Sequence, residues 1–360
     1  MPVVSIHRRV ALALALVALG CTGDPVGELP ADAGSGGTAG SGGSGGAGGI
    51  AGSGGSGGAG GIAGSGGGLA CDGGAPCVVP LVPASGASSF GIDLDATDIY
   101  YASGTDVWRL PRFGGTAVSV ASGLLGPRHV AVDDIHVVFS DGARKVYVTA
   151  KSGGGATLLY TASNGSAQIG GVATDGSYAY FTETSDKSSF DGAVSRVALS
   201  GGLPKVLALL PAAAPEGLFL DGAFVYVAER IGQSVVRIPA AGGAPTPVAT
   251  GRDQPVDVVV SGNWIAWAEN GGIGFVSKGG GTPSFAPTAG SPSHIAADDS
   301  AAYVTLPAYS AVYRAPLGGT NAMELVGDAG SPEDLVVGSA AVYFTNYAAG
   351  PPGSVLAIPK

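Results

Sequence analysis

The chain has 360 residues and a formal net charge of −10, and only 12% of its residues are charged. An acidic chain without a basic run argues against binding to nucleic acid and to anionic lipid head groups. Beyond residue 19, no uninterrupted apolar run approaches the roughly 20 residues that a membrane-spanning helix needs, which excludes a span in the rest of the chain.

Residues 1–20 have the pattern of a targeting segment. The basic group HRR at residues 7–9 precedes the apolar core VALALALVAL at residues 10–19. The sequence ALGC at residues 18–21 resembles the lipobox of bacterial lipoproteins, although its first two residues are Ala-Leu where Leu and then a small residue are usual. This resemblance implies cleavage after residue 20 and lipidation of Cys21, with palmitate among the acyl chains. The alternative is an ordinary signal peptide followed by an unmodified cysteine.

A lipid on Cys21 would anchor the protein to a membrane, since each buried methylene contributes about 0.8 kcal/mol. Thr22 stands where lipoproteins retained in an inner membrane tend to carry Asp. We therefore expect a cell-envelope protein at the outer membrane, on its periplasmic or its surface face. Removal of residues 1–20 takes away Arg8 and Arg9, so the net charge shifts from −10 to −12.

Residues 21–70 are predicted to be a flexible tether. From residue 34 onward they are almost entirely Gly, Ser and Ala, and the unit GSGGSGGAGGIA occurs twice from Gly40. Such a segment buries too little apolar surface to offset the entropy of ordering it. For about 35 flexible residues, the root-mean-square span is about 30 to 35 Å.

Cys71 and Cys77 bracket DGGAP just before the next region. With Cys21 lipidated, they are an even pair in an exported chain, and we expect a disulfide that closes a short loop. A metal site is disfavoured because the spacing is not CxxC and no His is near.

Residues 71–360 contain imperfect copies of one unit, which is clearest at residues 214–250. Its pattern predicts four short strands at residues 217–220, 224–228, 235–238 and 247–250, with a tight turn after the first strand. The Pro-containing fourth strand is expected on the sheet edge. The residue that begins the first turn recurs every 37 to 46 residues, at Asp95, Asp133, Asp175, Asp221, Ser261, Asp298 and Gly338. This period is typical of propeller blades.

The last copy lacks a fourth strand, and residues 73–86 resemble the missing piece as it stands at residues 242–251. We therefore predict an all-β, seven-bladed β-propeller of four-stranded antiparallel blades, closed by an N-terminal strand in the last blade. In repeat length and strand pattern, residues 71–360 resemble propellers of the NHL and YWTD-like repeat class. YFTE, YFTN and YVAE stand where the YWTD tetrapeptide would be. We expect a monomer.

The first strand of each blade lines the channel of a propeller, so residues at its start are candidates for a site at the channel mouth. This position holds Gly91, His129, Gly171, Gly217, Asp257, His294 and Asp334, and the preceding position adds Arg128, Glu216 and Glu333. His129, Asp257, His294 and Asp334 form a set suited to a divalent cation, and His129, His294 and Glu216 are candidate catalytic groups. The structural alternative is that these polar residues only cap strand ends.

Two classes of function follow. The first is a noncatalytic binding or scaffold propeller on a lipid tether, with a protein or glycan ligand and no cofactor; Gly fills three of the seven mouth positions, and no nucleophile with a base is recognisable. The second is an enzyme that uses the channel cluster and a cation, by analogy with propeller lactonases and with lyases that use a channel His. Trp108 and Trp264 are less regular than the repeated aromatic residues, and they are candidates for carbohydrate stacking.

Overall fold

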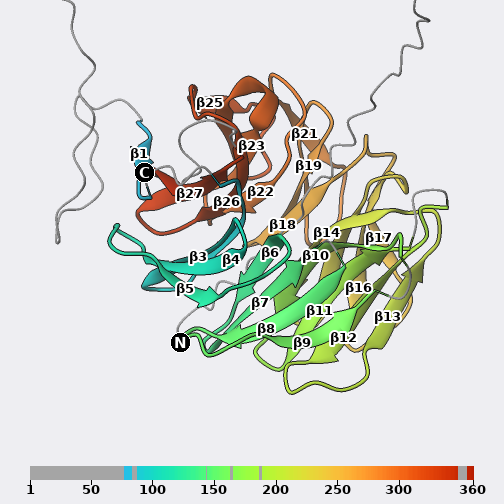
Figure 1. Cartoon of the computed structure of the whole chain (residues 1–360). Coiled ribbons are helices and arrows are strands. Elements are labelled where there is room, and N and C mark those ends of the chain that lie inside the picture. Colours follow the sequence, from blue (N-terminus) through green and yellow to red (C-terminus); the bar gives the residue numbers. More distant parts are fainter. Residues whose placement is uncertain (1–76, 83–86, 143, 163–164, 186–188, 348–354) are drawn as a thin grey trace, which may run out of the picture. The chain divides into compact units, whose positions relative to one another are not determined.

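The computed structural model describes residues 77–82, 87–142, 144–162, 165–185, 189–347 and 355–360. These residues form seven four-stranded antiparallel sheets, which we call blades 1 to 7 (Figure 1). The only helix within these residues is one short 3-10 turn, η1 (Pro307–Tyr309). No described helix is long and apolar enough to span a membrane. The predicted fold class is confirmed.

Blades 1 to 6 follow the chain from the innermost to the outermost strand. The innermost strands are β2 (Ser89–Leu94), β6 (Pro127–Val132), β10 (Gln168–Thr174), β14 (Pro215–Asp221), β18 (Asp257–Ser261), β22 (Ile295–Ala297) and, in blade 7, β26 (Pro332–Val337). The second strands are β3 (Asp98–Ser103), β7 (His136–Asp141), β11 (Tyr178–Thr184), β15 (Phe224–Glu229), β19 (Trp264–Glu269), β23 (Ala301–Leu306) and β27 (Ala341–Asn346).

The third strands are β4 (Asp106–Pro111), β8 (Lys145–Ala150), β12 (Gly192–Ala198), β16 (Ser234–Pro239), β20 (Gly272–Ser277), β24 (Ala311–Pro316) and β28 (Val355–Pro359). The outermost strands are β5 (Val118–Ala121), β9 (Thr157–Thr161), β13 (Lys205–Leu210), β17 (Thr246–Thr250), β21 (Ser284–Pro287), β25 (Met323–Val326) and β1 (Val79–Pro80). The strand at Pro247 is outermost, as its proline predicts.

The ring closes in blade 7 as the sequence predicts. Strand β1 pairs antiparallel with β28, with Val79 opposite Ala357 and Pro80 opposite Leu356. The N–H of Leu81 adds a bond to the carbonyl oxygen of Val355 at 2.9 Å. Figure 1 shows β1 in blue beside the red strands of the last blade. Residues from the two ends of the chain therefore share one sheet, and no strand of blade 7 is missing.

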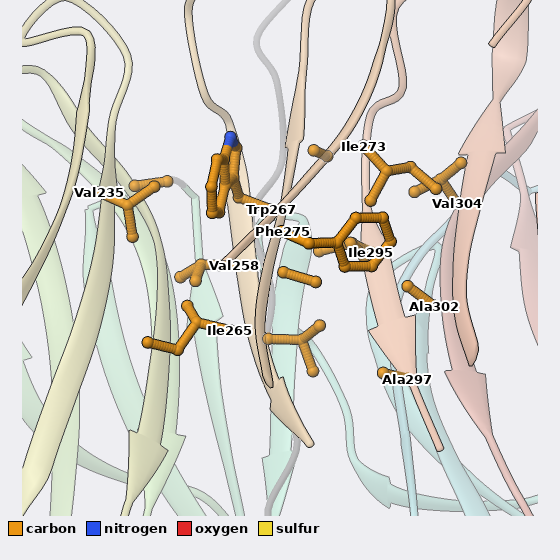
Figure 2. Packing of buried hydrophobic residues seen from close by; sticks show 14 of the residues in the cluster. Val235, Val258, Ile265, Trp267, Ile273, Phe275, Ile295, Ala297, Ala302 and Val304 are labelled. Atoms are coloured by element: carbon orange, nitrogen blue, oxygen red, sulfur yellow. The ribbon is translucent and has the colours of Figure 1, made fainter. Parts of the chain in front are cut away.

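The core lies between the blades, where each sheet packs against its neighbour. Figure 2 shows one such layer, in which Trp267 and Phe275 of blade 5 lie close to Ile295 and Val304 of blade 6. Gly274 is required there, because a Cβ on it would lie 2.1 Å from the Trp267 ring. The repeated aromatic residues, predicted to be core, are all at most 4% exposed: Tyr101, Phe139, Phe181, Trp267 and Phe344.

The turn after the innermost strand is stabilised by its aspartate. In blade 1, Asp95 Oδ1 accepts the backbone N–H groups of Thr97 and Asp98, each at 2.8 Å. Asp133, Asp175 and Asp298 make the equivalent pairs of bonds in their blades. This local bonding is the reason Asp recurs at this position, as predicted from turn chemistry.

Candidate functional site at the channel mouth

The residues at the channel mouth lie where the innermost strands carry β-bulges. In β2, the pairing with β3 shifts between Ser89 and Ile92, and equivalent shifts occur in β6, β10, β14 and β26. In β14 the bulge contains Glu216 and Gly217, so the strand begins at Pro215, two residues before its predicted start. A bulge re-aims the side chains of its unpaired residues. The mouth side chains are thus released from the regular alternation of the strand.

The carboxylates of Asp257 and Asp334 connect neighbouring blades. Each accepts the N–H of the next residue of its own strand, at 2.8 and 2.7 Å. The second oxygen of Asp257 accepts the N–H of Ile295 in blade 6 at 3.2 Å, and that of Asp334 accepts the N–H of Ile92 in blade 1 at 3.3 Å. Asp93 joins blade 1 to blade 2 in the same way. These buried carboxylates hold the innermost strands together.

His129 is 1% exposed and bound to Ser140 of β7. Its backbone N–H donates to Ser140 Oγ at 3.2 Å, and its Nδ1 lies 2.7 Å from the same oxygen. Burial, followed by the charges of Arg128 and His294, lowers the pKa of His129 from 6.5 to about 3. The imidazole is therefore neutral at pH 7, and a large part of its hydrogen bonding is internal to blade 2.

His294 uses one ring nitrogen and leaves the other open. Nδ1 lies 2.5 Å from the carbonyl oxygen of Glu333 in blade 7, and because a carbonyl only accepts, Nδ1 carries the proton. Nε2 is buried and has no hydrogen-bond partner among the described residues. The charge of His294 acts on His129 although blades 7 and 1 lie between them. Both rings therefore face the channel.

Glu216 is paired with Arg230. The Arg230 Nε donates to Glu216 Oε1 at 2.9 Å, and the two side chains are 29% and 15% exposed. Burial raises the pKa of Glu216, and the hydrogen bond and charge of Arg230 oppose that shift. The structure does not place Glu216 in the group that acts electrostatically on His129.

Of the four predicted cation ligands, only His294 keeps an open donor atom in the bonds described above. Within the described ranges, no group of three or more His, Cys, Asp or Glu side chains is placed to hold a metal ion. Cys77 is disulfide-bonded. Cys71 and Cys21 lie outside the described residues, as do residues 1–20 and 21–70, so the Cys71–Cys77 pairing, the lipidation and the tether stay predictions.

An arc of aromatic and charged side chains on blades 7, 1 and 2 was not singled out by the sequence patterns. Phe90, Arg128 and Glu333 occupy one repeat position, directly before the mouth residues, in three consecutive blades. The Arg128 guanidinium lies over the Phe90 ring, 5.0 Å from its centroid. The ring of Tyr347, directly after β27, lies 5.5 Å from that of Phe90. We call Phe90, Arg128, Glu333 and Tyr347, together with His294, the mouth arc.

Glu333 is coupled to the other groups of the mouth arc. Burial raises the pKa of Glu333, the charges of His294 and Arg128 oppose the shift, and Asp334 adds to it. The alignment of the repeats already contained the signal for Phe90, since it stands where Arg128 and Glu333 do. Tyr347 lies in a loop outside the aligned strands, so the repeat alone does not reveal it.

The opposite face carries ion pairs between neighbouring blades, which the sequence analysis also missed. A lysine directly after a third strand reaches the first turn of the preceding blade. The pairs are Lys151–Asp95 at 2.7 Å, Lys278–Asp221 at 2.8 Å and Lys360–Asp298. A basic residue at that repeat position is the signal that identifies them. Trp108 and Trp264 are partly buried and pack against the hydrophobic clusters between blades.

Comparisons with known proteins support the fold. No protein-family model and no curated protein matches the chain. YCF48 from Cyanidioschyzon merolae is similar in structure, with a TM-score of 0.60 and 15% identity over 78% of this chain and 98% of that chain. YCF48 bound to D1 peptide has a TM-score of 0.57 and 12% identity over 81% and 99%.

A gluconolactonase, XC5397 from Xanthomonas campestris, has a TM-score of 0.49 and 14% identity, over 79% of this chain and 89% of that chain. That likeness carries no argument for lactone hydrolysis. At such identities, the comparisons show the architecture alone: the chain is a seven-bladed β-propeller.

Proposed function

We propose that this protein is a noncatalytic binding propeller, held at the bacterial cell envelope by a lipid on Cys21, which takes its ligand at the mouth of the central channel. The observation that carries the proposal is the contrast between two sets of mouth residues. Asp257, Asp334 and Glu216 bind protein groups, as does His129. The mouth arc instead presents side chains with unused hydrogen-bonding capacity beside an exposed aromatic ring.

The exposure of Tyr347 supports recognition at this face. Its side chain is 51% exposed although it stacks on Phe90 and lies beside the buried polar groups of the mouth. Aromatic and arginine side chains are the groups that most often carry binding energy at protein surfaces. One structural neighbour has been solved as YCF48 bound to D1 peptide, which is consistent with binding by a propeller of this architecture.

Site-specific photocrosslinking in cells tests where the ligand binds. A benzophenone amino acid replaces Tyr347 in one variant and Phe113 in a matched control, since Phe113 is 50% exposed and follows β4 at the opposite face. We expect adducts at position 347 that disappear when Arg128→Ala is added. Equal adducts at both positions, or none at position 347, would contradict binding at the mouth.

Fractionation tests the anchor separately. The wild-type chain should incorporate labelled palmitate and sediment with the outer membrane, whereas Cys21→Ser should incorporate none and be released. Retention of label in Cys21→Ser would contradict lipidation at this residue.

A channel-site hydrolase or lyase is the second candidate, and the open Nε2 of His294 beside the buried Glu333 favours it. A neutral imidazole nitrogen without a partner is a candidate general base. Turnover of a lactone series by the wild-type chain, lost in His294→Gln, would support this second function over the first.

A further inference from the structure

We propose that the ligand is an uncharged glycan, bound by the mouth arc with one sugar ring on the Phe90–Tyr347 pair and hydroxyl groups on Arg128, Glu333 and His294. This inference rests on the proposed function and names the class of its ligand. The argument uses the aromatic pair, the three polar groups and their charges in turn.

The aromatic pair provides the surface for a sugar ring. The ring centroids of Phe90 and Tyr347 lie 5.5 Å apart with 49° between the ring planes, and about half of Tyr347 is exposed. Sugar rings have one face of C–H groups, and such a face packs on an aromatic ring with the polarity that the quadrupole of the ring favours. Arg128 lies over the other ring of the pair and restricts the position of Phe90.

Three polar groups around this pair have unused hydrogen-bonding capacity within the described part of the chain. The Arg128 guanidinium donates no hydrogen bond and forms no ion pair there, and the Glu333 carboxyl group accepts none. His294 Nε2 is buried without a partner, and its ring is held by the bond from Nδ1 to the Glu333 carbonyl oxygen. The arc thus offers donors at Arg128 and an acceptor at His294 Nε2 of the neutral ring.

The mixture of charges selects an uncharged ligand. An anionic ligand that paired with Arg128 would lie beside Glu333 and Asp334, and a cationic one that paired with Glu333 would lie beside Arg128. The coupling of Glu333 to all these groups shows that they are close. A hydroxyl group both donates and accepts, so neighbouring hydroxyls can satisfy Arg128, Glu333 and His294 together. A purely apolar ligand would leave His294 Nε2 without a partner, which costs free energy.

The repeated use of the same position supports a built arrangement. Phe90, Arg128 and Glu333 come from three consecutive bulges, and the hydroxyls of Thr345 and Thr305 bind the carbonyl oxygens of Phe90 and Glu333. These bonds tie each bulge to the neighbouring blade. The backbone beneath the arc is therefore fixed before a ligand arrives, which lowers the entropic cost of binding.

The test is an array of uncharged glycans, acidic glycans and peptides, probed with the detergent-solubilised full chain and followed by titration calorimetry on the hits. We expect saturable binding confined to uncharged glycans. Tyr347→Ala and Arg128→Met should each weaken it at least tenfold, and His294→Gln should weaken it as well.

Matched controls exist for both surface variants. Phe113→Ala removes an equally exposed aromatic ring from the opposite face. Arg237→Met removes a second arginine that lies over a phenylalanine, 5.2 Å from the Phe224 centroid. Both should bind as the wild type does, and thermal unfolding should show that all the surface variants are folded.

The outcomes separate this inference from the proposed function. Peptide or acidic-glycan binding that needs Tyr347 and Arg128 would overturn the uncharged glycan and leave the binding propeller. Uncharged-glycan binding unaffected by Tyr347→Ala and Arg128→Met would overturn the mouth arc as its site. Failure to bind any class, together with no crosslink at position 347 in cells, would overturn both.

Discussion

Asp334 of the last blade accepts a hydrogen bond from the backbone N–H of Ile92 in the first blade, although 242 residues separate them in the chain. Asp334 is 2% exposed, and its other carboxylate oxygen accepts the N–H of Leu335. One side chain thus joins the two ends of the ring along its innermost strands, while β1 joins them along the outer edge. The closure is made at both radii of the last blade.

Replacement of Asp334 by Ala should destabilise the fold by about 3 kcal/mol, because two buried N–H groups lose an ionised acceptor. The measurement is urea unfolding at pH 7. Asp221→Ala is the control, since Asp221 is 37% exposed in a surface ion pair and should change stability by less than about 1 kcal/mol. Equal effects of the two substitutions would contradict the closing role of Asp334.

A chain that begins at residue 87 lacks β1 and should be less stable than one that begins at residue 71 by about 3 to 5 kcal/mol. It loses the buried Leu81 and the backbone bonds to β28. For a domain of this size, about 1 kcal/mol shifts the thermal midpoint by about 2 to 4 °C. An unchanged midpoint would show that the ring holds without its outer strand.

The Lys151–Asp95 pair should make stability depend on acid. Burial alone would raise the pKa of Asp95, but the hydrogen bond and charge of Lys151 and the turn N–H groups lower it from 3.8 to about 2. A lowered folded-state pKa contributes stability above the unfolded value of about 3.8 and loses it as the pH falls toward 2. The contribution at pH 7 is about 2 kcal/mol.

Lys151→Met should therefore reduce stability at pH 7 by up to that amount and shift the titration of Asp95, followed by carboxylate NMR, to higher pH. Lys278→Met is the matched control, because the Lys278–Asp221 pair is more exposed and should contribute less. If both variants lose the same stability, burial is not what gives the Lys151–Asp95 pair its strength.

His129 should make the protein less stable in mild acid. Its pKa is lowered to about 3 in the folded state, so unfolding takes up a proton between about pH 6.5 and 3. Stability from this group is present above pH 6.5 and falls by up to about 1.4 kcal/mol per pH unit below it. His129→Gln should flatten the slope of unfolding free energy between pH 6 and 4, whereas His136→Gln, a partly exposed site, serves as the control. A slope unchanged by His129→Gln would mean that this imidazole is protonated in the folded protein.

The architecture follows from the sequence because its determinants are local and repeated. Asp95 and its equivalents make turns with their own neighbours, and the alternation around Phe139 or Phe344 shows which face is buried. The closing strand is predictable from the resemblance of residues 73–86 to an outer strand elsewhere. Each of these features needs only a few adjacent residues and a count of the copies.

The use of the mouth residues is less predictable, because it depends on which group of a neighbouring blade each side chain meets. Asp257 is placed as a cation ligand would be, yet its oxygens bind the N–H groups of Val258 and Ile295. Sequence spacing gives the ring position of a carboxylate but not the bulge that turns it toward a backbone donor. Tyr347 belongs to a loop that no repeat describes, so its stacking on Phe90 is visible only in three dimensions.

The two-residue strand β1 also determines how the ring would respond to mechanical load. A pull on the chain from its N-terminal side enters the propeller at β1, which pairs with β28 through only Val79 and Pro80. Proline donates no backbone hydrogen bond, so few bonds resist the force before it reaches Leu81. Tension would therefore detach the outer strand of one blade first and leave the other six blades paired. The position of β1 makes this seam the weakest mechanical element of the fold.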